Sequence, residues 1–376
     1  MSRDSLCKSR DGPKILTMKC RVFPRKIFWG FVIAAVAASS SDAVGSGPVR
    51  NGSPELNLCP LASEIYPCTC QWDEDLWEPD LSCRNIESVE HLKRIFETAF
   101  FPEKRFWRIS LSGSPLGDLP ADLFNDVQFD EVHLNDCNIS SVHPEAFRAS
   151  KPNMDTLELY SNQLTDDSFP WSTLNEYPKL WRVHLEHNLF TVFPTLISES
   201  LEDISLWANP IVTFSRESFE GAPNLRIINV SPYIESFPED SFMPLEKLEE
   251  LHLSDNRLGN LVEGQFFLNS PNFEYLYLSN NSIASIQPDA ITGITSTRLL
   301  LFLDHNLLTN LREEVFMPLM SRMLDGWGGI EFAGNPLVCD CEMYWLLSNA
   351  TLLSNVRSGT CDGQELADVD ISGWEC

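Results

Sequence analysis

The chain has 376 residues with 27 basic and 54 acidic side chains, which give a formal net charge of -27 at pH 7. This excess of negative charge repels phosphate backbones, so the composition argues against a nucleic-acid ligand. The first 43 residues hold 8 basic and 3 acidic residues, so residues 44–376 carry an even larger charge of -32. We interpret this charge mainly as solubilising, with attraction to cationic partners or divalent metal as the functional alternative.

Residues 1–43 have the pattern of a secretory signal. A basic stretch over residues 19–26 precedes an apolar run over residues 27–38, and small residues follow as far as Ala43. The apolar run is short for a bilayer span, so we predict a cleaved signal, with an uncleaved anchor as the alternative. Met18 is an alternative start site. The chain is therefore expected to be secreted and extracellular.

Residues 44–58 are rich in Gly, Ser and Pro and are predicted to form a flexible leader. Four cysteines with the spacing C-x8-C-x-C-x12-C follow, namely Cys59, Cys68, Cys70 and Cys83. We expect residues 59–105 to form a disulfide-bonded cap, because secretion supplies an oxidising compartment. Spacing alone leaves all three pairings open, and a four-cysteine zinc site is the less favoured alternative. Apolar positions over residues 86–96 predict a short amphipathic helix or an irregular coil within this cap.

Residues 106–337 are copies of one pattern, which is clearest in residues 248–258, LEELHLSDNRL. The L-x-L piece is typical of a short strand whose leucines point to one side, because side chains alternate along a strand. The asparagine that follows occupies a tight turn, where its amide can satisfy backbone groups that a curved coil leaves unpaired. The pattern resembles the leucine-rich repeat. The asparagine position is filled, in order, by Ser114, Cys137, Asn162, Asn188, Asn209, Tyr233, Asn256, Asn281, Asn306 and Asn335.

These copies predict the fold. Successive asparagine positions lie 21–29 residues apart, which suits one strand and one return segment per coil. One copy cannot bury its own apolar side chains, so the copies must stack. We therefore predict an α/β leucine-rich repeat solenoid, a horseshoe with parallel strands on the concave face and disulfide caps at both ends. Recurring phenylalanines in the return segments are expected to form a second apolar column: Phe124, Phe147, Phe219, Phe242, Phe266 and Phe316.

Two copies depart from the pattern. Cys137 takes an asparagine position, which the repeat consensus allows, so we predict a buried free thiol, with an intermolecular disulfide as the alternative. The copy that begins at Leu225 has Pro232 and Tyr233 where the turn asparagine belongs. We expect its coil to be distorted.

Residues 338–376 are predicted to form the second cap. The stretch NPLVCDCEMYWLL, with Cys361 and Cys376 after it, resembles the C-terminal cap of extracellular leucine-rich repeat proteins. The first cysteine cluster resembles their N-terminal cap. Together the resemblances imply the disulfides Cys59–Cys70, Cys68–Cys83, Cys339–Cys361 and Cys341–Cys376. No apolar stretch follows Cys376, so we expect neither a membrane span nor a lipid anchor at this end.

The sequence contains acceptor motifs for N-glycosylation at Asn51, Asn138, Asn229, Asn280 and Asn349. A glycan at Asn229 or Asn280 is expected to stand near the strand face and to narrow the surface available for binding.

The outward strand residues line the concave face, which is the usual ligand surface of such solenoids. Neighbouring strands lie about 4.8 Å apart, so aromatic and charged residues of adjacent copies fall into patches. Aromatic and charged side chains together are typical of protein-binding hot spots, with ordinary exposed strand residues as the alternative. The predicted partner-binding residues are Glu158, Tyr160, Trp181, His184, Glu186 and Trp207, and, in a second and more apolar patch, Tyr277 and Phe302.

The sequence does not favour an enzyme. His184 beside Glu158 and Glu186 could hold a metal or act as a base. However, the sequence contains no nucleophile elbow, H-E-x-x-H helix, phosphate loop or dinucleotide fingerprint. An open concave sheet also excludes water poorly. We therefore predict no catalytic residues, no resident metal and no cofactor.

The stretch CPLASEIYPCTC, the irregular repeats and the CDCEMYWLL cap together have a more specific resemblance. They are similar to arthropod secreted proteins of the kind that form the leucine-rich repeat, non-catalytic subunit of a shrimp luciferin 2-monooxygenase complex. This resemblance implies a secreted scaffold that binds another secreted or cell-surface protein, with a separate catalytic subunit as one possible partner. The alternative is an extracellular recognition molecule, such as an innate immune or matrix sensor.

Overall fold

The structure is a computed structural model that describes residues 58–73, 78–230, 232–323 and 327–376. The predicted signal segment, nearly all of the predicted leader and the acceptor motif at Asn51 lie outside the described residues.

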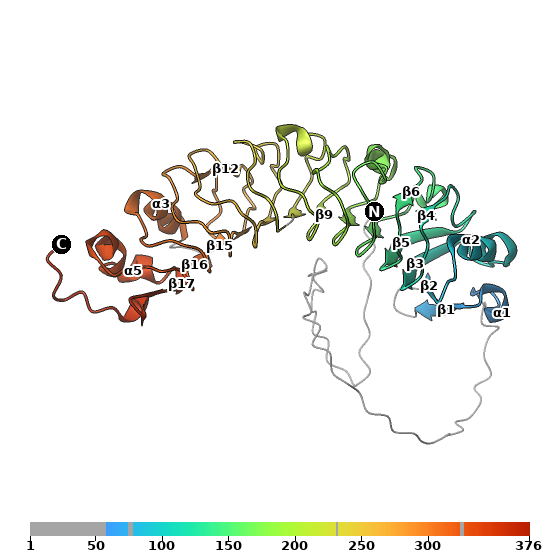
Figure 1. The fold of residues 1–376 in the computed structure, drawn as a ribbon, viewed down its shortest axis with the longest axis horizontal. Coiled ribbons are helices and arrows are strands. Elements are labelled where there is room, and N and C mark those ends of the chain that lie inside the picture. Colours follow the sequence, from blue (N-terminus) through green and yellow to red (C-terminus); the bar gives the residue numbers. More distant parts are fainter. Residues whose placement is uncertain (1–57, 74–77, 231, 324–326) are drawn as a thin grey trace, which may run out of the picture. The chain divides into compact units, whose positions relative to one another are not determined.

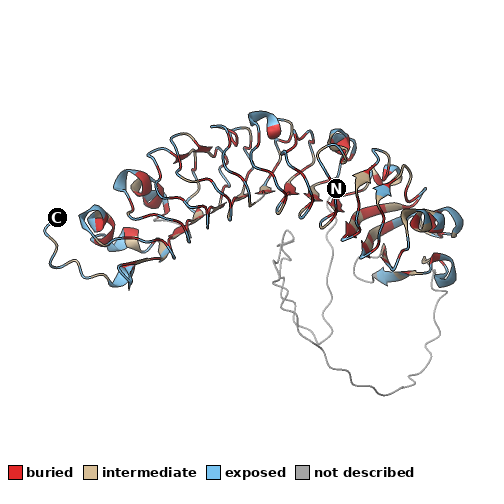
Figure 2. Cartoon of the chain, in the orientation of Figure 1, coloured by how far each residue is buried: buried red, intermediate tan, exposed pale blue. Residues whose placement is uncertain are grey.

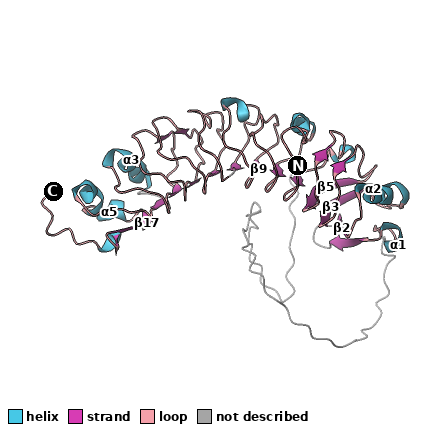
Figure 3. Cartoon of the chain, viewed as in Figure 1, coloured by secondary structure: helices cyan, strands magenta, loops and turns pink. Residues whose placement is uncertain are grey.

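A 13-stranded sheet runs through the whole described chain, and all of its strands after the first two pair in parallel with their neighbours. The strands line the concave side of the stacked coils (Figure 1). Short turns and helices form the opposite side (Figure 3). In sheet order the strands are β1 (Cys68–Asp73), β2 (Glu78–Arg84), β3 (Arg105–Ser112), β5 (Gln128–Asn135), β7 (Thr156–Glu158), β8 (Arg182–His184), β9 (Asp203–Ser205), β10 (Ile227–Asn229), β11 (Glu250–His252), β13 (Tyr275–Tyr277), β15 (Leu300–Phe302), β16 (Gly329–Glu331) and β17 (Val356–Ser358).

The register places equivalent repeat positions side by side. Leu251, for example, pairs with Ile228 on one side and with Leu276 on the other. The predicted inward positions, from Ile109 to Phe332, are all at most 4% exposed. Buried residues therefore follow the strands from coil to coil (Figure 2), and the predicted leucine-rich repeat solenoid with parallel concave strands is confirmed.

The return segments contain few regular elements. Two longer helices stand near the ends of the stack, α2 (Val89–Thr98) and α3 (Glu313–Met323), and three short helices are α1 (Ala62–Ile65), α4 (Tyr344–Leu347) and α5 (Ala350–Leu353). The 3-10 turns are Arg148–Ser150, Trp171–Glu176, Arg216–Ser218, Cys341–Met343 and Leu366–Asp368. Two-residue strands pair between return segments, β4 (Asp118–Leu119) with β6 (Ser141–Val142) and β12 (Phe266–Phe267) with β14 (Ile291–Thr292), while β18 (Thr360–Cys361) and β19 (Gln364–Glu365) form a hairpin.

The helix α2 is amphipathic, as the apolar spacing in the cap predicts. Leu92, Ile95 and Phe96 are buried, and the Ser88 hydroxyl caps the helix by accepting a hydrogen bond from the backbone N–H of His91. Phe96 packs against the rings of Phe124 and Phe129, so this helix covers apolar side chains of the first repeat.

The turn asparagines tie successive coils together through their side-chain amides. Asn162 Oδ1 accepts from the backbone N–H groups of Cys137 and Ile139, and its Nδ2 donates to the carbonyl oxygens of Leu134 and Leu159. Other turn asparagines, Asn306 for example, repeat this arrangement. The buried backbone groups of two coils are thus satisfied by one side chain, which explains the asparagine in the pattern.

The return-segment phenylalanines form the second apolar column that their spacing predicts. Phe242 is 1% exposed. Its ring lies 5.4–6.1 Å from the rings of Phe214, Phe219, Phe237 and Phe266. A second group of rings surrounds Phe124 nearer the N-terminal cap. Apolar packing therefore continues between coils on both sides of the solenoid interior.

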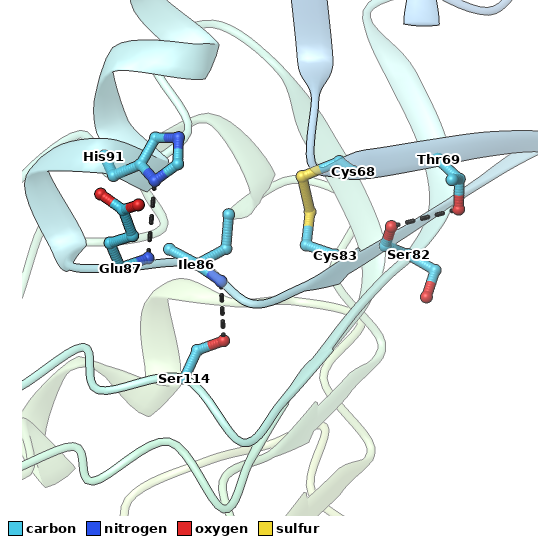
Figure 4. Close-up of a disulfide and its surroundings, with 8 residues drawn as sticks. All are labelled: Cys68, Thr69, Ser82, Cys83, Ile86, Glu87, His91 and Ser114. Carbon is cyan, nitrogen blue, oxygen red and sulfur yellow. Dashed lines mark hydrogen bonds between the residues drawn. A yellow bond between two sulfur atoms is a disulfide. The ribbon is translucent and has the colours of Figure 1, made fainter.

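The N-terminal cap joins the repeats without a break in the sheet, because β2 pairs in parallel with β3. Its disulfides are Cys59–Cys70 and Cys68–Cys83, the pairs that the resemblance implies. Figure 4 shows the second disulfide beside the β1–β2 hairpin, with the backbone N–H of Ile86 donating to Ser114 Oγ at 3.2 Å. Ser114, which occupies the first asparagine position of the repeats, therefore satisfies a backbone N–H group of the cap.

The C-terminal cap closes the other end. Its disulfides are Cys339–Cys361 and Cys341–Cys376, again the pairs that the resemblance implies. The Trp345 indole N–H donates to the carbonyl oxygen of Leu311 at 2.7 Å, which fixes the cap on the last repeat.

The copy that begins at Leu225 keeps its place in the sheet. Its strand β10 pairs in unshifted register with β9 and β11. The expected distortion therefore does not reach the strand. The missing asparagine is compensated in part from the next coil, because Asn256 Oδ1 accepts from the backbone N–H of Ile234 at 2.7 Å.

Cys137 is a buried free thiol within the described chain, as predicted. Its Sγ lies 3.2 Å from the carbonyl oxygen of Asn135 and 3.5 Å from that of Leu111, so the thiol can donate to either. Burial raises the pKa of Cys137 to about 11. The thiolate, which is the reactive species, is therefore disfavoured at neutral pH.

We expect Cys137 to resist alkylation in the native protein. Iodoacetamide at about pH 8 should leave its peptide unmodified, since the thiol is both buried and protonated. A cysteine introduced at the exposed position His143 should react within the same time and serves as the control. Peptide mass spectrometry measures both, and rapid native modification of Cys137 would contradict the assignment.

Candidate interaction surface

Three outward columns of side chains cover the concave face, and the first two contain one residue from each strand between β2 and β16. The first column is Asp80, Arg108, Glu131, Thr156, Arg182, Asp203, Ile227, Glu250, Tyr275, Leu300 and Gly329. The middle column is Ser82, Ser110, His133, Glu158, His184, Ser205, Asn229, His252, Tyr277, Phe302 and Glu331. The third column follows the strand ends and contains Arg84, Ser112, Asn135, Tyr160, Glu186, Trp207, Ser254, Ser279 and Asp304. Acidic residues outnumber arginines in these columns, so the face is negatively charged when its histidines are neutral.

Carboxylates and histidines alternate across β5 to β9 in what we call the acidic–histidine patch. Its members are Glu131, His133, Glu158, His184, Glu186 and Asp203. His133 lies between two carboxylates, with its Nε2 at 3.4 Å from Glu131 and its Nδ1 at 3.4 Å from Glu158. His184 likewise lies between two, with its Nε2 at 3.2 Å from Asp203 and its Nδ1 at 3.6 Å from Glu186.

The pKa values of His184 and of the two carboxyl groups beside it are shifted in different directions. Burial by itself lowers the pKa of His184, but the hydrogen bond to Asp203 and the charge of Glu186 outweigh it and raise the pKa above its usual value. Burial would raise the pKa of Asp203, but its contacts with His184 and Arg182 hold it below its usual value. Burial raises the pKa of Glu186. The surroundings therefore favour the charged forms of Asp203 and His184 and the neutral form of Glu186.

Glu186 is poorly satisfied. Its Oε1 is 3.6 Å from His184, longer than an ordinary hydrogen bond, and its Oε2 is shielded from solvent without a hydrogen-bond donor. The neighbouring Ser205 Oγ is also buried without a hydrogen-bond partner, and Ser205 is only 2% exposed. Asp203, by contrast, accepts from Arg182 Nε at 3.0 Å. Side-chain oxygens of Glu186 and Ser205 could thus still form hydrogen bonds at the β8–β9 end of the patch.

Two aromatic residues flank Glu186 in the third column, and we call them the aromatic edge: Tyr160 and Trp207. They belong to the coils on either side of Glu186, because Ser161 N–H donates to the Glu186 carbonyl and His187 N–H donates to that of Trp207. Tyr160 is 41% and Trp207 38% exposed. The Trp207 ring packs edge-on against His187 at 4.9 Å. This edge presents large apolar area beside charge, as protein-binding hot spots do.

Three stacked rings form an aromatic ladder farther along the middle column: His252, Tyr277 and Phe302. The His252–Tyr277 and Tyr277–Phe302 centroids are 4.1 Å and 4.5 Å apart, with the ring planes within 12° and 6°. Burial raises the pKa of Tyr277 to about 12, so it stays protonated at neutral pH. The ring faces cover one another, and the ladder presents ring edges to the concave side.

The structure brings most of the predicted partner-binding residues together. Glu158, Tyr160, His184, Glu186 and Trp207 lie within three successive coils, and Tyr277 stacks on Phe302 as the second patch. Trp181 stands apart at the start of β8, where it stacks on Arg182 at 4.3 Å. Along the strand it lies roughly 16 Å from Glu186.

Sequence reasoning missed the first outward column. Glu131, Arg182 and Asp203 complete the patch, yet the sequence argument considered only the two columns that follow the first inward residue. These residues lie two positions before the middle column, so applying the same alternation toward the start of each strand would have found them.

A polar hollow of about 260 Å³ lies at the N-terminal end of the concave face, next to the patch. Serine side chains line part of the hollow and, being small, leave space above the strands. The larger side chains of His133, Glu158 and Tyr160 line another part. The described residues contain no group of three or more His, Cys, Asp or Glu residues placed to hold a metal ion.

The acceptor asparagines within the described chain occupy different places. Asn138 and Asn280 are exposed in turns, and Asn349 is exposed at the start of α5. Asn229 stands in the middle column of β10, between Ser205 and His252. A glycan on Asn229 would separate the acidic–histidine patch from the aromatic ladder.

The fold and the repeat geometry agree with comparisons to known proteins. Two leucine-rich repeat family models match, one over residues 199–258 and the other over residues 272–294. The chain therefore contains leucine-rich repeats, and its described residues fold as the solenoid that such repeats form. A chain from the solved octameric complex of Latrophilin 3, Unc5D and FLRT2 superposes with a TM-score of 0.65, at 19% identity, over 82% of this chain and 98% of that chain. At that identity the likeness concerns the fold.

Two curated relatives extend the comparison. The Oplophorus-luciferin 2-monooxygenase non-catalytic subunit of Oplophorus gracilirostris is 29% identical over 320 residues, which are 83% of this chain and 86% of that protein. Osteomodulin of Rattus norvegicus is 25% identical over 65% of this chain and 60% of its own length. The first relative is named non-catalytic, which agrees with our reading of this leucine-rich repeat protein as a non-enzyme.

No helix among the described residues of this leucine-rich repeat protein has the length and apolar character that a membrane crossing requires.

Proposed function

We propose that this leucine-rich repeat protein is a secreted, non-catalytic scaffold that holds another secreted or cell-surface protein on its concave face. The observation that supports it most is the aromatic edge beside the acidic–histidine patch. Tyr160 and Trp207 remain 41% and 38% exposed although the sheet around them is well packed. Such rigid, amphipathic anchors beside charged groups concentrate binding energy in protein interfaces.

The similarity to a non-catalytic subunit suggests one kind of partner. That relative belongs, by its name, to a luciferin 2-monooxygenase. We propose that the chain here also accompanies a separate catalytic chain, as an accessory subunit of an oxygenase-like complex. The cap disulfides suit an oxidising compartment, which supports secretion through the predicted signal segment.

The domain limits fit the same proposal. We propose a signal segment over residues 1–43, a leader over 44–58, caps over 59–105 and 338–376, and about ten repeats over 106–337. The sheet continues from cap to repeats, so the caps would act as ends of one binding scaffold, not as independent modules.

Alanine at both residues of the aromatic edge is the sharpest test. Purify the protein from its native secretion, identify any chain that co-elutes in stoichiometric amount, and measure its affinity for recombinant variants. We expect Tyr160→Ala/Trp207→Ala to weaken binding by about 30-fold or more, the effect of losing an interface hot spot. Circular dichroism should show an unchanged fold, because both side chains are surface residues.

A matched pair of exposed aromatic residues elsewhere serves as the control. Tyr66→Ala/Trp327→Ala removes the same side chains from positions that are 78% and 79% exposed. This variant should bind like the unmodified protein. If both double variants bind the partner normally, the concave assignment is wrong.

A second candidate, recognition of a microbial or matrix surface, is favoured by the polar hollow beside Tyr160. It predicts that the native protein elutes alone and that the same aromatic variant loses binding to such a surface.

A further inference from the structure

Several carboxylates on the concave face of the described chain pair with histidines, and two of them, Glu158 and Glu186, lie next to the aromatic edge. Glu158 lies 3.4 Å from His133 Nδ1, and Glu186 lies 3.6 Å from His184 Nδ1. By contrast, Asp203 is held by Arg182 at 3.0 Å, and Asp80 by Arg108 at 3.1 Å. When the histidines are neutral, Glu158 and Glu186 therefore have no permanent cation close by.

We propose that Glu158 and Glu186 receive an arginine or lysine side chain of a basic partner segment between Tyr160 and Trp207, and that protonated His184 competes with it. The inference rests on the proposed function, since it takes the concave face as the binding surface. It adds the chemistry of the partner and a condition for its release.

Geometry gives the incoming side chain room. Tyr160 and Trp207 belong to coils two apart, so their backbones are roughly 9.6 Å from each other with Glu186 between them. A planar guanidinium, which needs about 3.5 Å on each face, fits between two such residues. Arginine also stacks well on aromatic rings and pairs in bidentate fashion with carboxylates.

Unused hydrogen-bonding capacity points to the same place. Glu186 Oε2 and Ser205 Oγ are buried without a hydrogen bond of ordinary geometry, although Ser205 lies close enough to Glu186 to lower the pKa of this carboxyl. Ser205 is 2% exposed on the outward side of β9. The hollow lined by His133, Glu158 and Tyr160 opens on the other side of the site. A guanidinium that approaches Glu158 and Glu186 from the side of the hollow would supply the hydrogen-bond donors that these carboxylates lack.

The charges of the surrounding strands favour a cation. Around His184 the facing groups are Glu158 from β7, Asp203 and Ser205 from β9, and Arg182 and Glu186 on its own chain segment. Around His133 they are Arg108 and Ser110 from β3, Glu158 from β7, and Glu131. The negative charge of residues 44–376 adds long-range attraction for a basic segment.

Protonation acts as an internal competitor. The pKa of His184 is raised above its usual value, and the imidazolium that forms below this pKa sits between Asp203 and Glu186. Below that pKa the charge of Glu186 is neutralised from within, and above it Glu186 is open to an external cation. Binding of a cation should therefore strengthen as the pH rises and should release protons.

The test uses fluorescein-labelled tetraarginine, with tetraglutamate as the negative probe, at about 150 mM salt, where charges beyond about 8 Å are screened. We expect Glu158→Gln/Glu186→Gln to weaken tetraarginine binding by about 10-fold or more. The control Glu220→Gln/Glu246→Gln removes the same charge at exposed positions away from the strands and should change binding by less than about 2-fold. Equal losses in the two variants would overturn the site and leave only general charge attraction.

The pH arm tests the competition. Tetraarginine affinity should be about 5-fold higher near pH 8 than near pH 6 in the unmodified protein, and this ratio should shrink toward one in His184→Gln. An unchanged ratio in that variant would overturn the histidine role. If the native partner still requires Tyr160 and Trp207 while tetraarginine binding ignores Glu158 and Glu186, the cation inference fails and the proposed function stands.

Discussion

Replacing Phe242 by alanine should lower the free energy of unfolding by about 3–5 kcal/mol, the cost of removing a fully buried aromatic ring from a well-packed core. The ring contacts four other phenylalanines, two from the preceding coil, one from its own coil and one from the next coil. Because each coil is stable only against its neighbours, the loss should reach beyond one repeat. Guanidinium unfolding followed by tryptophan fluorescence and by circular dichroism measures the shift.

The neighbouring residue gives a control within the same turn. Met243 is 49% exposed, so Met243→Ala should change stability by less than about 0.5 kcal/mol. If Phe242→Ala and Met243→Ala unfold at the same denaturant concentration, the return-segment rings do not form the second core that the structure shows.

The second large effect is expected from Asn162→Ala. The substitution removes two acceptor contacts for Cys137 and Ile139 and two donor contacts to Leu134 and Leu159, all between buried groups. Leaving such groups unpaired costs about 1–3 kcal/mol each, reduced where water can enter, so we expect a loss of about 3 kcal/mol or more.

Hydrogen exchange localises that effect. The backbone amides of Cys137 and Ile139 should exchange faster in Asn162→Ala, because their acceptor is gone. Asn272→Ala removes an exposed asparagine and should leave both stability and exchange unchanged. Slow exchange of these two amides in Asn162→Ala would show that another group satisfies them.

Much of the fold can be predicted from the sequence because the repeat imposes two independent patterns. Alternation in L-x-L fixes which strand residues point inward, and the turn asparagine fixes where each strand ends. The inward residues from Ile109 to Phe332 are accordingly buried. The same register places Glu158, His184 and Glu186 together before any coordinates are known.

The contacts between the outward side chains could not be predicted from the repeat pattern, which specifies only the inward residues and the turns. Asp203 reads as an ordinary charged residue at a strand start, yet it is 5% exposed and paired with both Arg182 and His184. The poor satisfaction of Glu186 depends on side-chain orientations, which periodicity does not specify. The parallel stacking of His252, Tyr277 and Phe302 likewise follows from rotamers and not from spacing.

The acidic–histidine patch and the aromatic ladder divide the concave face into two regions of different chemistry. The first suits a charged segment whose binding varies with pH, and the second suits apolar side chains. Asn229 lies between the two regions, so a glycan there would prevent one partner segment from crossing directly from one region to the other.

The central claim is that a partner protein binds the concave face at β7 to β9. Hydrogen exchange of the chain alone and in complex with the protein that co-purifies with it tests this most directly. We expect protection over residues 156–162, 182–188 and 203–209, with no change in return segments such as Arg216–Ser218 on the opposite side. Protection confined to the return segments, with unaltered exchange in β7 to β9, would contradict it.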